Sequence, residues 1–321
     1  MQNHKAHSSN TPADDKNVKA KAKAKANVSF WTYFAITMSI VAGAILPQLK
    51  AAELNTAASF QVEVIGEGKP VLMIPGLMSD SRVWQHTAAA LKQDYQLHLI
   101  SVAGFAGTPA IEGELLPRLQ QDLLHYMDEQ QLQKPAVVGH SLGAFMAFAL
   151  ASAAPERIGT VVAVDGLPYL APIFSRDPAT QVADMQSQAI QLKNYYQQLN
   201  GEQLKAAATQ GIEIQARAAG HQQLVLAMAA ASDGPSVGQA MYELLTTDLR
   251  PKVGAIQSKV WLLGASGALP APYQEQAKAL YQQQISGIAN ATLLMNTGSR
   301  HFMMLDEPEW LISQLRQALQ E

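Results

Sequence analysis

Residues 135–143 read Pro-Ala-Val-Val-Gly-His-Ser-Leu-Gly, and they are the most informative stretch of the chain. The apolar run 135–138 is typical of a buried strand, and the small residues after the stretch are typical of a helix. Between them, Gly139-His-Ser-Leu-Gly143 fits G-x-S-x-G, in which a serine occupies a sharp turn from strand to helix. Side chains at Gly139 and Gly143 would clash in so tight a turn. Ser141 is therefore the candidate nucleophile, held above the sheet at the amino end of a helix.

Apolar runs alternate with helical patterns on both sides of this turn, which indicates an α/β fold with a mainly parallel sheet flanked by helices. The expected strands are 60–65, 71–74, 97–102, 136–138, 160–164, 260–263 and 292–295. The expected helices are 81–95, 115–132, 141–154, 273–281 and 307–319.

Residues 168–253 interrupt this alternation, because they are rich in Gln and Ala and contain no convincing strand. We expect them to form an inserted helical cap over one end of the sheet. The predicted organisation is a targeting segment (1–52), the first part of an α/β core (53–167), the cap (168–253), and the second part of the core (254–321).

The first 52 residues predict export. A polar, lysine-rich start is followed by the apolar run 30–45, and small residues suited to signal-peptidase cleavage follow. This order describes a secretory signal. An uncleaved anchor in the inner membrane, formed by residues 29–47, is the alternative, because the apolar run is near the lower limit for spanning a bilayer. Both interpretations place the rest of the chain across the membrane, as a periplasmic or secreted protein.

Charge and composition exclude several classes of function. Residues 1–52 carry seven Lys and two Asp, which leaves a net charge of −8 on the remainder. An acidic body with no basic stripe argues against nucleic acid as a partner. The chain has no Cys, so disulfides and thiolate metal sites are excluded. No histidine and carboxylate cluster has metal-ligand spacing, and no G-x-G-x-x-G loop is present, so neither a metal nor another cofactor is expected.

The glycine turn after the second expected strand supplies a further part of the site. Residues 73–78 read Met-Ile-Pro-Gly-Leu-Met. In this architecture the loop at that position gives one backbone N–H to the oxyanion hole, and the residue after the nucleophile gives the other. The predicted donors are Leu77, with Met78 as the alternative, and Leu142.

The general base is predicted to be His301. It is the one histidine of eight in a loop between the last expected strand and the last expected helix. That loop faces the carboxyl ends of the strands, and the order nucleophile, acid, histidine requires a late position for the base. The others lie in the targeting segment, in expected helices or strands, in the cap, or at the variable position of the serine turn: His4, His7, His86, His98, His125, His140 and His221.

The acid is predicted to be Asp165, at the end of the strand 160–164. The usual place, after the strand 260–263, reads Gly-Ala-Ser-Gly-Ala and holds no carboxylate. The rivals have structural interpretations: Asp306 and Glu307 as caps of the last helix, Asp248 in a salt bridge between cap and core, and Ser266 as at most a weak partner of the imidazole.

In chain order, the Pro75-Gly76 loop, the GHSLG turn, Val164-Asp-Gly-Leu-Pro168 and His301-Phe-Met-Met-Leu-Asp306 resemble the α/β-hydrolase fold superfamily over about residues 58–321. They are similar to exported bacterial members whose triad acid follows the sixth strand, in the strand numbering of that family. The resemblance implies a two-step acyl-enzyme mechanism and a pocket under the cap. Two features depart from the pattern: Pro75 replaces a frequent histidine, and the usual acid position is empty.

The expected activity is therefore that of a serine hydrolase, esterase- or lipase-like, acting on carboxylic esters of small or apolar molecules. A serine nucleophile excludes the dehalogenase and epoxide-hydrolase branches of the fold, which use a carboxylate. An amidase or aminopeptidase, and a non-catalytic binding module on a hydrolase fold, remain alternatives. The Met and Tyr side chains of the cap could line an acyl pocket or form plain core: Met185, Tyr195, Tyr196, Met241 and Tyr242.

Overall fold

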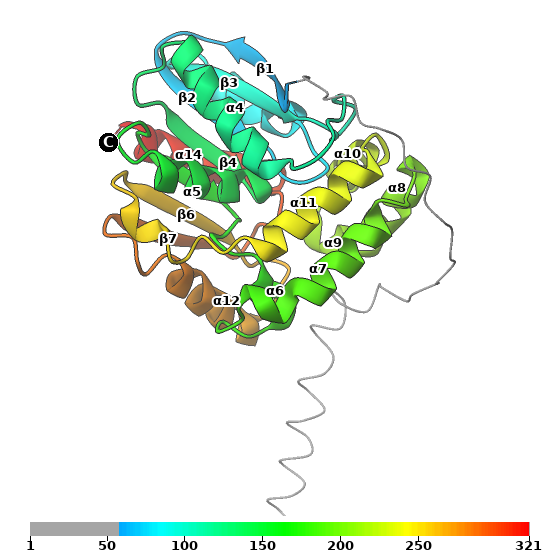
Figure 1. Ribbon diagram of the computed structural model, residues 1–321. Helices are drawn as coiled ribbons and strands as arrows, with labels where there is room; N and C mark the ends of the chain where they lie inside the picture. The colour runs from blue at the N-terminus through cyan, green and yellow to red at the C-terminus, as the bar shows by residue number, and fades with distance from the viewer. Residues whose placement is uncertain (1–57, 321) are drawn as a thin grey trace, which may run out of the picture. The chain divides into compact units, whose positions relative to one another are not determined.

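The computed structural model describes residues 58–320 and contains one sheet of seven strands (Figure 1). The strands are β1 (Phe60–Ile65), β2 (Lys69–Ile74), β3 (Tyr95–Val102), β4 (Ala136–His140), β5 (Val161–Val164), β6 (Val260–Ala265) and β7 (Ala291–Asn296). Their order across the sheet is β1-β3-β2-β4-β5-β6-β7, with β1 antiparallel to β3 and every other neighbouring pair parallel. The expected α/β class and the mainly parallel sheet are confirmed.

Helices cover both faces of the sheet, so its central strands are buried on both sides and consist mainly of apolar residues. One face packs against α4 (Leu116–Glu129), α5 (Leu142–Ala153) and α12 (Ala271–Gln284). The other packs against η1 (Ser81–Trp84), α3 (Gln85–Leu91), α13 (Met303–Asp306) and α14 (Pro308–Gln320). Alternate residues of a strand supply the two layers, as Leu72 and Met73 of β2 illustrate.

One expected helix was too long. The pattern over residues 81–95 predicts a single helix, whereas the structure has the short η1, then α3, and begins β3 at Tyr95. Tyr95 is buried and pairs in register with Lys69 of β2, so its place in the sheet overrides the helical spacing of the residues before it.

The residues between β5 and β6 form only helices and connecting turns. The helices are α6 (Ala171–Ser175), α7 (Val182–Tyr196), α8 (Gly201–Gln210), α9 (Ile212–Gln215), α10 (Ala219–Ala230), α11 (Gly234–Thr246) and η2 (Val253–Ala255). We call α6–α11 the cap helices. Figure 1 shows α7 and α11 side by side in this block, and a buried apolar cluster joins them.

The cap helices are attached to loops that leave the carboxyl ends of the strands. Asp233 N–H donates to the carbonyl oxygen of Gly104 after β3 at 2.8 Å. Buried Glu243 of α11 accepts the N–H groups of Leu115 and Leu116, at 3.0 and 2.7 Å, at the start of α4. A carboxylate at a helix N-terminus satisfies N–H groups that have no partner within the helix.

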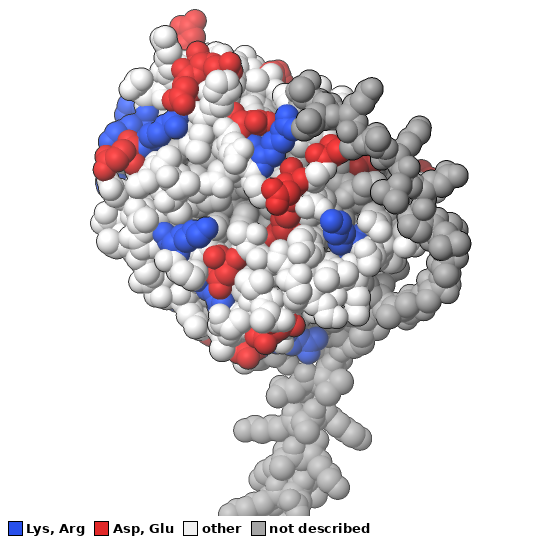
Figure 2. Space-filling view, in the orientation of Figure 1, with Lys and Arg blue, Asp and Glu red and all other residues white. Residues whose placement is uncertain are grey.

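Figure 2 shows acidic and basic side chains interspersed over one face of the molecule, with no continuous basic stripe. The predicted targeting segment, residues 1–52, lies outside the described residues. Within residues 58–320, no helix is both long and apolar enough to cross a bilayer.

Candidate active site

Ser141 lies on the turn from β4 to α5 with its backbone in the left-handed region, at φ 53°. A Cβ on Gly139 would lie 2.0 Å from the carbonyl oxygen of Gly143, so the chain can double back only without a side chain there. A Cβ on Gly143 would lie 2.1 Å from the carbonyl oxygen of Ile74 in β2. The first glycine is thus required by the turn itself, and the second by the neighbouring strand. Ser141 is left partly exposed at the carboxyl end of β4.

The loop after β2 passes beside Ser141, since a Cβ on Gly76 would lie 3.2 Å from the Ser141 Cβ. The side chain and the N–H of Ser79 hold this loop by bonding to the Gly76 carbonyl at 2.9 and 3.3 Å. Within residues 58–320, no hydrogen bond uses the backbone N–H of Leu77 or of Leu142. Both N–H groups are thus available as hydrogen-bond donors, as the predicted oxyanion hole requires.

His301 and Asp165 are in direct contact. The Nδ1 atom of His301 lies 2.6 Å from Oδ2 of Asp165, the length of a charge-assisted hydrogen bond. The Asp165 side chain is almost fully buried, with 8% exposed, whereas 27% of the His301 side chain is exposed. Because a carboxylate can only accept, Nδ1 carries the proton, and Nε2 is the basic atom of the neutral ring.

The backbone of Asp165 explains how its carboxylate reaches this position. At φ 46° the chain turns out of the sheet directly after β5. The Asp165 N–H still donates to the carbonyl of Leu263 at 2.8 Å. The next bond of a parallel ladder would join the N–H of Ala265 to the backbone carbonyl of residue 165, but Oδ1 of Asp165 accepts it instead, at 2.8 Å. The same oxygen accepts the hydroxyl of Tyr281 at 2.7 Å.

The loop of His301 packs against the residue that precedes Ser141. Nε2 of His140 lies 3.0 Å from the carbonyl oxygen of His301, and the two rings have centroids 4.6 Å apart. No hydrogen bond joins the Ser141 hydroxyl to His301 in the described part of the chain. Proton transfer requires the hydroxyl and Nε2 to approach to about 2.6–3.2 Å, or to share one water.

His140 is fully buried, and burial lowers its pKa well below the ordinary value of a histidine; the nearby His301 lowers it further. Because a carbonyl oxygen can only accept, Nε2 of His140 carries the proton. Nδ1 then has no partner within residues 58–320 and lies 2.8 Å from the position of a Cβ on Gly76. From the sequence, His140 is only the variable position of the G-x-S-x-G turn. Nothing in the motif indicates that its side chain contacts the loop of His301.

A segment of the cap is bonded to the same loop. The N–H groups of His301 and Phe302 donate to the carbonyl oxygens of Ile214 and Gln215, at 3.2 and 2.8 Å. Arg300 donates to the carbonyl of Ala216 at 3.0 Å. We call residues 213–217, which run from α9 into the following turn, the cap clasp. Sequence reasoning did not predict it, because no motif marks the pairing of two irregular segments.

The rival acids have other partners. Asp306 accepts the backbone N–H groups of Arg217 and Arg300, each at 2.9 Å, and Glu307 forms an ion pair with Arg217. Both acids directly precede α14, where the sequence placed them, and their side chains fasten the cap clasp to the loop of His301. Neither side chain forms a hydrogen bond with the imidazole of His301 in the described part of the chain.

Asp248 pairs with Arg250 at 2.7 Å, and Arg250 donates to the carbonyl oxygens of Pro178 and Thr180. All four residues lie between β5 and β6, within the predicted cap of residues 168–253. The ion pair that was predicted to join cap and core therefore joins two parts of this segment instead. The hydroxyl of Ser266 is buried without a partner among the described residues, and the Ser266 N–H donates to the Asn296 carbonyl.

The Met and Tyr side chains of the cap divide between core and surface. Met185 and Met241 are buried in the cluster that joins α7 and α11, and Tyr196 packs against it. Burial raises the pKa of Tyr196 to about 12. Tyr195 is 36% exposed, and the Tyr242 hydroxyl accepts from Gln186 at 3.1 Å. Leu77 also packs against this cluster, which links the apolar interior of the cap to the loop beside Ser141.

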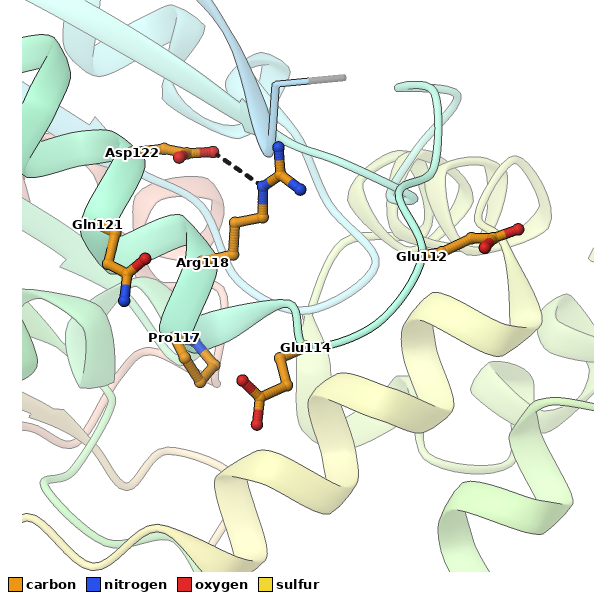
Figure 3. Close-up of a pocket in the computed structure, with 6 residues that line it drawn as sticks. All are labelled: Glu112, Glu114, Pro117, Arg118, Gln121 and Asp122. Atoms are coloured by element: carbon orange, nitrogen blue, oxygen red, sulfur yellow. Dashed lines mark ion pairs between the residues drawn. The ribbon is translucent and has the colours of Figure 1, made fainter. Parts of the chain in front are cut away.

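A surface hollow lies elsewhere, at the start of α4 (Figure 3). It is lined by Glu112, Glu114, Pro117, Arg118, Gln121 and Asp122, and Arg118 pairs with Asp122 at 3.5 Å. None of the candidate catalytic residues belongs to its lining. Within residues 58–320, no group of three or more His, Asp or Glu side chains is placed to hold a metal ion.

Comparison with known proteins places this geometry in a family. The family model described as "alpha/beta hydrolase fold" matches residues 69–314. The chain belongs to the α/β-hydrolase fold family. Its mostly parallel sheet of seven strands, flanked by helices, is thus that of an α/β-hydrolase.

Individual relatives match in part. A pimeloyl-[acyl-carrier protein] methyl ester esterase of Aeromonas salmonicida is 32% identical over 112 residues, 34% of this chain and 42% of the relative. The chain thus matches under half the length of this relative. Two solved structures share the fold. A thermophilic esterase from Thermogutta terrifontis has a TM-score of 0.68 at 17% identity, covering 81% of this α/β-hydrolase and 93% of the other chain. An esterase from Exiguobacterium antarcticum has a TM-score of 0.67 at 17% identity, covering 82% and 96%.

Proposed function

We propose that this α/β-hydrolase is a carboxylic ester hydrolase that acts through Ser141, His301 and Asp165. The observation that carries the proposal is the 2.6 Å contact between His301 Nδ1 and Asp165 Oδ2, on a loop packed against the serine turn. A buried carboxylate on Nδ1 orients the imidazole and stabilises the cation that it becomes. The esterase named among the relatives supports an ester as the substrate.

In the proposed reaction, His301 Nε2 removes the proton of the Ser141 hydroxyl as Ser141 Oγ attacks the ester carbonyl carbon. The N–H groups of Leu77 and Leu142 stabilise the negative charge on the carbonyl oxygen. Collapse of this intermediate breaks the bond to the alcohol oxygen, which receives the proton from His301. Water, deprotonated by His301, then attacks the acyl-enzyme and releases the acid with Ser141 restored.

The test is hydrolysis of short-chain p-nitrophenyl esters by residues 53–321 and by the Ser141→Ala variant. The variant is expected to lose activity by about 10⁴-fold or more, because both the nucleophile and its acyl-enzyme are removed. Mass spectrometry after fluorophosphonate treatment should place the label on Ser141. Equal ester hydrolysis by both proteins would remove Ser141 from the mechanism. A chain that takes no label and cleaves no ester would be a binding module, and faster cleavage of amino-acid anilides would indicate an amidase.

We further propose that residues 1–52 direct export, as a cleaved signal or as a membrane anchor. The lysine-rich start followed by the apolar run 30–45 supports this, and the small residues after it suit cleavage. Amino-terminal sequencing of the protein from fractionated bacterial cells distinguishes the two forms. A soluble periplasmic chain that starts between residues 45 and 53 indicates a signal, and an intact chain in the membrane fraction indicates an anchor. An intact chain in the cytosolic fraction would contradict export.

A further inference from the structure

Tyr281 of α12 contacts Asp165 but has no role in the proposed mechanism. Its side chain is buried, and its hydroxyl lies 2.7 Å from Oδ1 of Asp165. The opposite oxygen of the same carboxylate contacts the His301 ring. Tyr281 therefore touches the acid from the side away from the base, and not the reacting atoms.

The sheet provides the space that lets α12 reach Asp165. Gly264 of β6 has no side chain, and a Cβ there would lie 2.9 Å from Cδ1 of Tyr281. The same Cβ would lie 2.5 Å from the Met295 sulfur. The Tyr281 ring thus fits over β6 at a glycine and extends to the carboxylate at the end of β5, the adjacent strand.

Two neutral donors hold Oδ1 of Asp165: the N–H of Ala265 at 2.8 Å and the hydroxyl of Tyr281. Two bonds on one oxygen fix the rotation of the carboxylate about its terminal bond, which directs Oδ2 at Nδ1 of His301. They also compensate the negative charge of a side chain taken out of water. Burial raises the pKa of Tyr281 well above its usual value, and the charge of Asp165 adds to this. The hydroxyl therefore keeps its proton and remains a donor over the working pH range.

We propose that Tyr281 is a positioning residue that orients the Asp165 carboxylate toward His301, with Gly264 providing the space for its ring. This inference rests on the proposed function, because it assigns Tyr281 a role within the Ser141–His301–Asp165 arrangement. It also explains how an acid at the end of β5 is held rigidly when the turn after β6 contains no carboxylate.

The charged and titratable groups around this pair come from several elements. Tyr281 of α12 faces Asp165, and buried His140 of β4 contacts the ring of His301. Arg300, next to His301, is engaged with Glu213 of the cap clasp at 3.2 Å. Removal of the Tyr281 hydroxyl changes only the first of these contacts.

The test compares Tyr281→Phe with the wild type in ester hydrolysis and in fluorophosphonate labelling, each across pH 5–9. We expect kcat to fall roughly ten-fold with KM changed less than about two-fold, since one hydrogen bond to a charged group is lost. We also expect the acidic limb of both profiles to move to higher pH. A carboxylate with one donor fewer attracts the imidazolium more strongly, so the basic form of the ring appears later as pH rises.

Tyr126→Phe is the matched control, because the Tyr126 hydroxyl also lies 2.7 Å from a buried partner, Nδ1 of His98, outside the site. Unchanged kcat and profile in Tyr281→Phe, with Ser141-dependent hydrolysis in the wild type, would overturn the role of Tyr281 and leave the proposed function standing. Equal losses in both variants would mean general destabilisation and also overturn it. A wild type that neither takes label on Ser141 nor cleaves esters would overturn both proposals.

Discussion

Two non-glycine residues of the candidate site, Ser141 and Asp165, have positive φ values, 53° and 46°. Such backbone conformations are unfavourable for residues with a Cβ and persist only where surrounding bonds fix them. For Ser141 the fixing bond runs from its N–H to the carbonyl of Val164, at 2.9 Å. For Asp165 the side chain takes the place of a backbone acceptor. The candidate nucleophile and the candidate acid are thus held at the ends of adjacent strands, β4 and β5.

At the residue scale, Asp165→Asn tests the acid with little change in shape. An amide can present its NH₂ group to Nδ1 of His301, which favours the ring tautomer that has its proton on Nε2 and removes the base. We expect kcat for p-nitrophenyl esters to fall by about three to four powers of ten. Circular dichroism should show an unchanged fold. Asp306→Asn is the control, since Asp306 bonds backbone N–H groups and not the imidazole. A larger loss in the control would transfer the role of acid to Asp306.

At the element scale, the cap clasp joins two parts of the chain that meet only after folding. Residues 213–217 lie in the helical block, and the loop that they bond carries His301 between β7 and α13. The exposed part of this contact is Arg217, which pairs with Glu307 and donates to the Asp306 carbonyl. The position of the His301 loop therefore depends on the cap clasp as well as on the sheet.

Arg217→Ala is expected to lower kcat/KM by about two- to five-fold with little effect on global stability. Exposed ion pairs contribute about 0–1 kcal/mol, so the loss should loosen the loop without unfolding the chain. The measurement is steady-state ester hydrolysis together with the midpoint of thermal unfolding. Arg316→Ala removes an exposed ion pair with Asp94 outside the site and is the control. Equal kcat/KM values in the two variants would contradict a role for the clasp.

Element order was the part of this molecule most open to prediction. Buried parallel strands read as short apolar runs, so β4 and β5 were found from composition, and the G-x-S-x-G turn located Ser141 between strand and helix. Contacts between irregular segments leave no such periodic signal. Only the folded structure shows the cap clasp, the bond of the Tyr281 hydroxyl to Asp165, and the bond of His140 to the loop of His301. Tyr281 in particular reads as one more apolar position of an amphipathic helix.

At the scale of the whole molecule, buried groups whose pKa is shifted in the fold couple its stability to pH. Burial lowers the pKa of His140 and, to a smaller extent, that of His98. The unfolded chain therefore binds these protons first as pH falls. The contribution of these neutral histidines to the free energy of unfolding is fully present above their ordinary pKa of 6.5. It is lost as pH falls below this value. Buried Glu243, whose pKa burial raises, acts in the opposite direction at more acidic pH.

We expect the free energy of unfolding of residues 53–321 to fall between pH 7.5 and 5.5, with His140 contributing up to about 1.4 kcal/mol per pH unit. Urea titrations at both pH values measure it. His140→Gln retains a donor for the His301 carbonyl but cannot be protonated, so its stability should fall less across this range. His86→Gln, at an exposed position, is the matched control. Equal pH slopes for His140→Gln and the wild type would contradict the contribution of His140.

The carbonyl oxygens of Ile214 and Gln215 accept hydrogen bonds from the loop of His301, and this restricts which segments of the chain can be exchanged with those of another protein. A chimera that exchanges residues 168–253 for the insertion of another hydrolase removes the carbonyl acceptors of the His301 and Phe302 N–H groups. The inserted sequence would need an irregular segment of matching length at the same place. Without it, the loop of His301 would lose these bonds and the imidazole would be displaced. The helices between β5 and β6 and the loop of His301 are in this respect inherited together.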